Sequence, residues 1–123
     1  MADRIIETPR IWGCVLSEGN GKISRDAVTL AKTAIAYPAG TVLGLITATK
    51  QYVFLAPAAN DGRQTAAAVL PAAVDATAAA MPALVIARLA EVSGSALAWP
   101  SGITAPQKAA ATADLAAATI IVR

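Results

Sequence analysis

The sequence predicts a small mixed β domain, mainly β and α+β in detail, with one short C-terminal helix and an N-terminal arm. Three observations lead to this prediction. The middle of the chain holds short aliphatic and β-branched runs that are separated by Gly, Pro and Asp-Gly turns. One segment near the C-terminus carries a complete set of helix-start signals. The first 22 residues show no sustained hydrophobic period.

The N-terminal part differs in character from the rest of the chain. The stretch "TPRIWGCVLSEGNGK" mixes charges, a proline, a tryptophan and a glycine-rich turn, which indicates an arm or an irregular lead-in. Such a segment is either a disordered tail or an arm that orders by adding a strand to a neighbour. The following "ISRDAVTLA" alternates imperfectly between apolar and polar residues, so it predicts an edge strand over residues 23–31.

The middle of the chain predicts β structure. "YPAGTVLGLITA" leaves a Pro-Gly turn as a strand in which Gly44 marks a bulge or a close contact, and "YVFLAP" completes a hairpin. Asp61-Gly62 is a strong turn signal. "TAAAVLPAAVD", "ALVIARLAEV" and, after the turn "SGS", "ALAW" are predicted as further strands. Alanine favours helix by propensity, but Pro71 and Pro82 would interrupt any helix here.

The C-terminal helix has the clearest local signals. Thr104 is a good N-cap, Pro106 stands in the first turn, and Gln107 lies three residues after Thr104. This arrangement is a capping box, and it predicts a helix that runs to about Ala117. The final "TIIVR" has strand chemistry and is predicted to rejoin the sheet.

Composition predicts one packed domain with a thin core. Of 123 residues, 56% are hydrophobic but only 4% are aromatic, and much of the apolar content is alanine, which buries little area. Small domains of this kind often gain stability by forming oligomers. The first ten residues lack the apolar core of an export signal, and the apolar runs are shorter than the ~20 residues of a membrane span. We expect a soluble protein made inside the cell, without a membrane partner.

The residues offer little chemistry. The chain has no histidine, which removes Ser-His and Cys-His catalysis and the commonest metal ligand. Its single cysteine, Cys14, excludes an internal disulfide and hints at no metal cluster. Carboxylates occur singly, the glycines of "AGTVLG" do not have phosphate-loop spacing, and the net charge of +2 is spread without a basic patch. We expect no enzyme activity, cofactor, metal, small-molecule substrate or direct nucleic-acid contact.

Trp99 and Pro100 precede the helix, and two roles are open for them. Trp99 either fills the core or forms a rigid apolar anchor on a subunit or partner surface, where tryptophan is enriched. We predict that Trp99 lies where the last β segment before the helix meets the helix, with Pro100 fixing the chain direction. Both residues are therefore candidates for an interface.

Taken in order, several of these pieces resemble the lambda-type phage head decoration protein family, the protein D family. The resemblance covers roughly residues 17–123, and its most specific parts are "SRDAVT", "GTVLG", "AANDG" and "WPSGIT" followed by the helix and "IIVR". Family members tend to have glycine where Thr119 stands, so this turn is expected to be built differently here. The segment "ETPRIWGC" is the least family-like.

The resemblance implies a β-clip-like fold and a non-enzymatic capsid protein. Members form homotrimers at local three-fold sites of the expanded capsid, on the outer surface of the virion. There they cement subunits of the major capsid protein against DNA pressure, after synthesis in the host cytoplasm. The N-terminal arm is flexible in the free protein and orders by pairing with a capsid strand.

On this resemblance the chain divides into an arm, residues 1–28, and a β-rich decoration domain, residues 29–123. The capsid-binding candidates in the arm are Trp12, Val15, Leu16, Ile23, Ser24, Arg25 and Val28. Two other hypotheses stay open on the residues alone. One is another oligomeric β module of a phage particle, a tail or adhesin component. The other is an enzyme of β-clip-like fold such as a nucleotide hydrolase, against which the lack of paired acids and of a phosphate loop counts.

Overall fold

The computed structural model describes residues 12–21 and 23–123, and within them the chain is mainly β with one short helix, as predicted. The elements in chain order are β1 (Val15–Glu18), β2 (Arg25–Leu30), β3 (Val42–Leu45), β4 (Tyr52–Phe54), β5 (Ala66–Val69), β6 (Met81–Ile86), β7 (Ala90–Val92), a 3-10 helix (Gly94–Ala96), α1 (Ala105–Ala117) and β8 (Ile120–Val122).

Five strands close into a barrel in the order β2-β4-β3-β5-β6. β3 and β4 form the predicted antiparallel hairpin. β2 pairs with β6 along its whole length, from Arg25↔Ile86 to Leu30↔Met81, and also meets β4 at Leu30↔Tyr52. The predicted edge strand over residues 23–31 is therefore wrong in its placement. Barrel closure gives β2 a neighbour on each side, and a single sequence shows no sign of closure.

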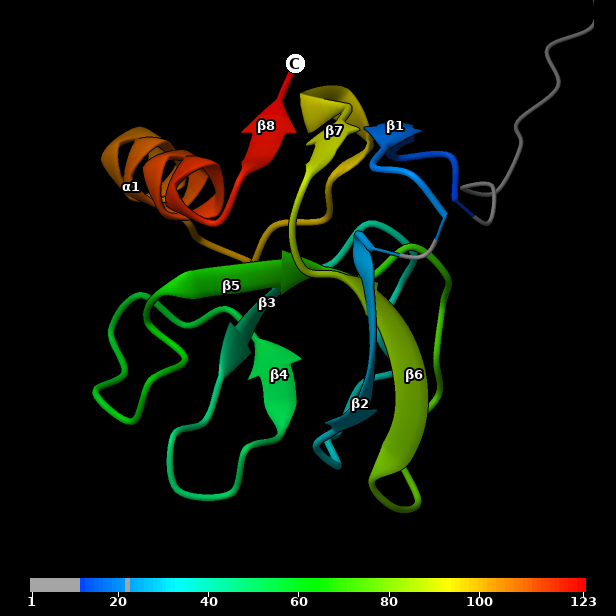
Figure 1. Ribbon diagram of the computed structural model, residues 1–123. Coiled ribbons are helices and arrows are strands. Elements are labelled where there is room, and N and C mark those ends of the chain that lie inside the picture. Colours follow the sequence, from blue (N-terminus) through cyan, green and yellow to red (C-terminus); the bar gives the residue numbers. More distant parts are fainter. Residues whose placement is uncertain (1–11, 22) are drawn as a thin grey trace, which may run out of the picture.

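The other three strands form a small sheet in the order β1-β7-β8, antiparallel between β1 and β7 and parallel between β7 and β8. Together with α1 this sheet lies over one end of the barrel (Figure 1). β8 thus returns to a sheet as predicted, although to the small one. "ALVIARLAEV", predicted as one strand, is divided between the two sheets as β6 and β7, because the backbone turns at Leu89, whose φ is +49°.

"ALAW" was predicted as a strand, and this prediction is wrong. The segment leaves the 3-10 helix and makes one isolated parallel bridge, Thr41↔Ala98. This bridge joins a single pair of residues, so no strand ladder extends through Trp99.

Two hydrophobic clusters hold these layers together. The cluster inside the barrel contains Leu30, Tyr37, Leu43, Ala68, Leu70, Ala76 and Val85. The second cluster lies between the barrel, the small sheet and α1. It contains Cys14, Val42, Leu55, Ala66, Val69, Ile86, Ala90, Val92, Leu97, Ala111, Leu115 and Ile120. Alanines fill several of these positions, so the layers approach closely and each buried residue contributes little area.

The C-terminal helix begins and ends as predicted. The Thr104 hydroxyl accepts from the backbone N–H of Gln107 (3.3 Å), and the Gln107 amide oxygen accepts from the N–H of Thr104 (3.0 Å). The chain then turns into β8 through Thr119, whose φ is +63°. A left-handed conformation favours glycine, which gives a physical reason for glycine at this position in the resembled family.

Candidate interaction surface

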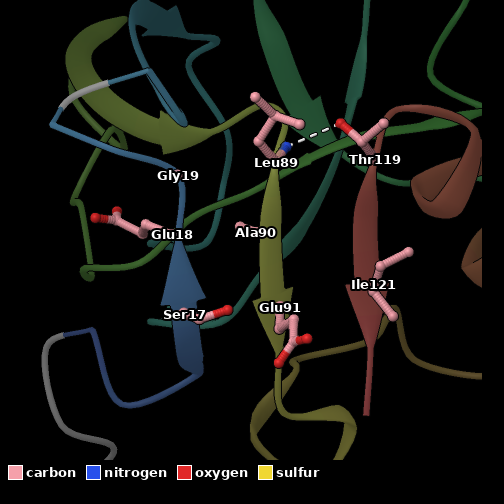
Figure 2. A pocket seen from close by; sticks show the side chains of 8 residues that line it. All are labelled: Ser17, Glu18, Gly19, Leu89, Ala90, Glu91, Thr119 and Ile121. Atoms are coloured by element: carbon pink, nitrogen blue, oxygen red, sulfur yellow. Dashed lines mark hydrogen bonds between the residues drawn. The ribbon is translucent and has the colours of Figure 1, made fainter.

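The outer face of the small sheet carries an open, shallow depression of about 450 Å³. Figure 2 shows its lining residues on β1, on β7 and at the start of β8. They are Ser17, Glu18, Gly19, Leu89, Ala90, Glu91, Thr119 and Ile121. The depression is therefore framed by all three strands of this sheet, with apolar side chains, two hydroxyls and two carboxylates around it.

Exposed apolar side chains gather at this face. Leu89 (45% exposed) and Ile121 (39%) line the depression. Leu16 (53%) stands on β1, at the irregularity that shifts the β1–β7 register between Val15 and Ser17, and Ile23 (50%) lies just before β2. Clusters of exposed apolar side chains with a polar rim are typical of protein contact surfaces.

The charges at this face are already paired. Glu18 binds Arg25, and Glu91 lies 3.3 Å from an Arg123 nitrogen. Among the described residues no group of three or more potential ligands could hold a metal ion. The face thus offers apolar area for burial beside carboxylates that are already paired with arginines.

β1 also presents a backbone edge. Within the described ranges, β1 pairs with β7 on one side and with no strand on the other. An unpaired strand edge is a ready template for a strand of another chain. An added strand would lie beside Leu16 and Ser17.

Trp12, Glu18 and Arg25 form a compact cluster beside β1. The Arg25 guanidinium carbon lies 4.1 Å from the centroid of the Trp12 ring. Its Nε and Nη2 donate to Oε1 and Oε2 of Glu18 at 3.0 and 3.1 Å. These hydrogen bonds raise the pKa of Arg25.

The structure separates the predicted arm residues into two groups. Leu16 and Ile23 are exposed and Arg25 is partly exposed, whereas Trp12 and Val15 pack partly buried against the second cluster. Ser24 is buried, where its hydroxyl accepts from the Gly19 N–H and donates to the Leu89 carbonyl, both at 2.8 Å. Val28 packs on the barrel cluster. Residues 1–11 lie outside the described residues.

Residues 12–21 and 23–28 include two strands that pair with the rest of the fold. β1 belongs to the small sheet and β2 to the barrel, and Cys14, just before β1, is 3% exposed. Strand pairing and the burial of Cys14 hold these described residues in place. The division into an arm and a decoration domain at residue 28 stays a prediction.

Sequence reasoning missed Leu89 and Ile121. Ile121 is the exposed middle residue of β8, between buried Ile120 and half-buried Val122, so strict strand alternation in "TIIVR" could have found it. Leu89 projects from a left-handed turn between two sheets, and no local signal in the sequence marks such a turn.

Trp99 has an intermediate position. It is partly buried, packs against the second cluster beside α1, and has the Lys108 ammonium 5.9 Å from its ring centroid. The Pro100 carbonyl accepts from the Ile103 N–H (3.3 Å) in the turn that leads to the helix. Neither residue lines the depression.

A small barrel with a satisfied core, an apolar outer face and an open strand edge defines a structural docking module. No helix in the described part of the chain is long and apolar enough to cross a membrane. The family model for bacteriophage lambda head decoration protein D matches residues 5–120, and the chain therefore belongs to this family. No curated protein matches the chain at a significant level. The family is one of structural capsid proteins, which assigns the chain a role in decorating the phage head.

Proposed function

We propose that the chain binds as a homotrimer at local three-fold sites on the outside of the expanded capsid. There it cements subunits of the major capsid protein against the pressure of packaged DNA. The observation that carries this proposal is the open edge of β1 beside the apolar outer face of the small sheet, in a chain of the head decoration family. The protein acts by binding alone, without catalysis or a cofactor, after synthesis in the host cytoplasm.

The N-terminal segment and the outer face of the small sheet form the capsid-binding part in this proposal. A capsid strand pairs with the segment at the β1 edge, and Leu16 and Ile23 lose exposed apolar area in the contact. Ser24 and Val28 are left out of the contact because they face the interior of the protomer. Residues 1–11, which lie outside the described residues, belong to the arm in this proposal.

The energetics favour a trimer. Ordering ten arm residues costs on the order of 10–20 kcal/mol of backbone entropy, so one arm alone binds weakly. Three arms on one particle raise the avidity by roughly 10²–10⁴ without new kinds of contact. Trimerisation is therefore part of the proposed mechanism.

A second apolar surface is available for contacts between protomers. The backbone N–H of Thr33 donates to the Ala76 carbonyl (3.2 Å). This hydrogen bond joins the loop after β2 to the segment before β6. The exposed apolar side chains of these segments and of β6 are Ile35 (71% exposed), Met81 (40%), Leu84 (48%) and those of alanines 78–80, which together we call the lower apolar surface. β6 begins at the end of the barrel away from the small sheet (Figure 1), so self-assembly there leaves the β1 edge free.

Binding to expanded empty capsids tests the proposal. We expect the full chain to co-sediment with capsids and to appear as density at three-fold positions by electron microscopy. A Leu16→Glu, Ile23→Glu variant and a chain lacking residues 1–11 should fold and bind far less. Retention on purified tails instead of capsids would favour the alternative, a tail or adhesin component.

A further inference from the structure

Trp12 is held in a conformation that its own backbone does not favour. Its φ is +65°, in the left-handed region where a side chain crowds the following carbonyl. Contacts must therefore hold it. Its N–H donates to the Pro71 carbonyl (2.7 Å), and its carbonyl accepts from the Val15 N–H (3.1 Å). Residue 12 is thus a fixed point, and the eleven residues before it start from there.

Two side-chain contacts add to this restraint: the Trp12 ring packs partly buried against the second cluster, and Arg25 stacks on it. Its guanidinium lies over the Trp12 ring and donates two hydrogen bonds to Glu18. Trp12 precedes β1, Glu18 ends β1, and Arg25 begins β2. One side chain thus ties both ends of β1 to the barrel, and the planar fork of arginine suits stacking and bidentate binding at once.

We propose that Arg25 is a positioning residue, which fixes where the N-terminal segment leaves the body and so sets capsid affinity without itself contacting the capsid. This inference rests on the proposed function. The guanidinium already uses its face on Trp12 and two of its nitrogens on Glu18. Its release would let Trp12 and β1 move before binding, and the capsid contact would then have to order them.

The test compares Arg25→Gln, Glu18→Gln and Trp12→Leu with the matched control Arg63→Gln. Arg63 has the same side-chain exposure as Arg25, 32%, and is also paired with a carboxylate, Asp61, but it belongs to a loop of the barrel. Hydrogen exchange at residues 13–18 of the free protein and binding to expanded capsids are measured for each variant. Thermal melting checks the fold, and Arg25→Lys serves as a milder second variant.

We expect the three cluster variants to exchange amide hydrogens in β1 faster than the unmodified chain. Capsid binding should weaken by about tenfold, which corresponds to the cost of ordering one or two side chains on binding. Arg63→Gln should change neither quantity. The double variant Trp12→Leu, Arg25→Gln should be no weaker than the worse single variant, because both remove the same restraint. Arg25→Lys should show a smaller loss, since it keeps a cation over the ring but loses the fork.

Two results would overturn the inference. Weaker capsid binding by Arg25→Gln with unchanged exchange in β1 would make Arg25 a direct capsid contact. Faster exchange with unchanged capsid binding would make the cluster a purely structural feature. If the unmodified chain fails to bind capsids, the proposed function and the capsid part of the inference fail together, whereas the exchange data still decide whether Arg25 holds Trp12.

Discussion

At the scale of single residues, Gly44 shows how a local signal and the packing of the barrel agree. The β3–β5 register shifts between Leu43 and Gly44, which is the predicted bulge. A Cβ at Gly44 would lie 2.5 Å from the Arg63 carbonyl oxygen and 2.6 Å from its Cα. Because these are backbone atoms, they cannot rotate away, and the position accepts only glycine without movement of the chain.

Gly44→Ala should therefore destabilise the protomer by about 1–3 kcal/mol, the usual cost of forcing extra atoms into a packed site. Denaturant unfolding measures the loss. Gly94→Ala is the control, because its new Cβ would meet a Val122 methyl at 3.0 Å, which can shift, and its cost should be much smaller. Equal stability of Gly44→Ala and the unmodified chain would contradict the close approach of Arg63.

Two roles are open for Trp99 on the sequence, one in the protomer core and one at an interface. Its partial burial against the second cluster predicts that Trp99→Ala costs about 3 kcal/mol of protomer stability, the lower end for a large aromatic. Melting of the protomer and assembly into the proposed trimer are measured together. A variant that melts normally but assembles poorly would instead assign Trp99 to an interface, as would an affinity loss of about 2 kcal/mol or more.

At the scale of elements, hydrogen bonds link the turn between α1 and β8 to the turn between β6 and β7. Each turn contains a residue with a left-handed backbone, Thr119 in the first and Leu89 in the second. The Leu89 N–H donates to the Thr119 hydroxyl oxygen (2.9 Å), and the Ala90 N–H donates to the Thr119 carbonyl (3.1 Å). The threonine hydroxyl thus makes a hydrogen bond that glycine could not make. Strain at Thr119 and this hydrogen bond oppose each other, and substitutions can separate them.

Thr119→Ala should destabilise the protein by about 1 kcal/mol, because the Leu89 N–H loses its acceptor while the strain stays. Thr119→Gly should be more stable than Thr119→Ala, since glycine removes roughly 1 kcal/mol or more of left-handed strain. Paired thermal melts measure the difference. Thr119→Gly that melts below Thr119→Ala would show that the backbone at this turn is unstrained.

Cys14 reports on the attachment of β1. Burial raises the pKa of its thiol, and only the thiolate reacts readily. We expect slow labelling by a thiol reagent at pH 8 in native protein and fast labelling in denaturant. A native rate within about tenfold of the denatured rate would mean that β1 opens freely from the body. Arg25→Gln should raise the native rate, and Arg63→Gln should leave it unchanged.

At the scale of the whole molecule, the exposed apolar residues lie at two ends. Leu16, Ile23, Leu89 and Ile121 surround the small sheet, whereas Ile35, Met81 and Leu84 lie along the barrel. This separation suits a protein that contacts other copies of itself through one surface and the capsid through the other. It also allows the two contacts to be tested apart.

If the proposed trimer forms through the lower apolar surface, Ile35→Glu should shift it toward monomers, because a buried interface would then have to desolvate a charge. The expected loss is about 2 kcal/mol or more for a central contact. Ile23→Glu is the control, with an equally large exposed residue on the other surface, and it should stay trimeric while losing capsid binding. Light scattering over a concentration series measures both. A trimer that persists in Ile35→Glu would exclude the lower apolar surface.

Local patterns were sufficient for elements that local physics controls. The capping box of α1 depends on residues within four positions of one another, so its start at Ala105 follows directly from "TAPQ". The β3–β4 hairpin and the Asp61-Gly62 turn are equally local. Prolines at 71 and 82 correctly outweighed the helix propensity of alanine.

What the sequence by itself determined is the class of the fold, the helix, most strands and the family, because spacing, turn chemistry and the order of motifs are written along the chain. Only the tertiary structure decided barrel closure, the division of residues 81–92 between two sheets and the pairing partners of β1 and β2. These features depend on pairings between distant segments, such as β2 with β6 and β1 with β7. Their free energy comes from long-range burial and ladder hydrogen bonds, and no window of neighbouring residues records which partner a strand will meet.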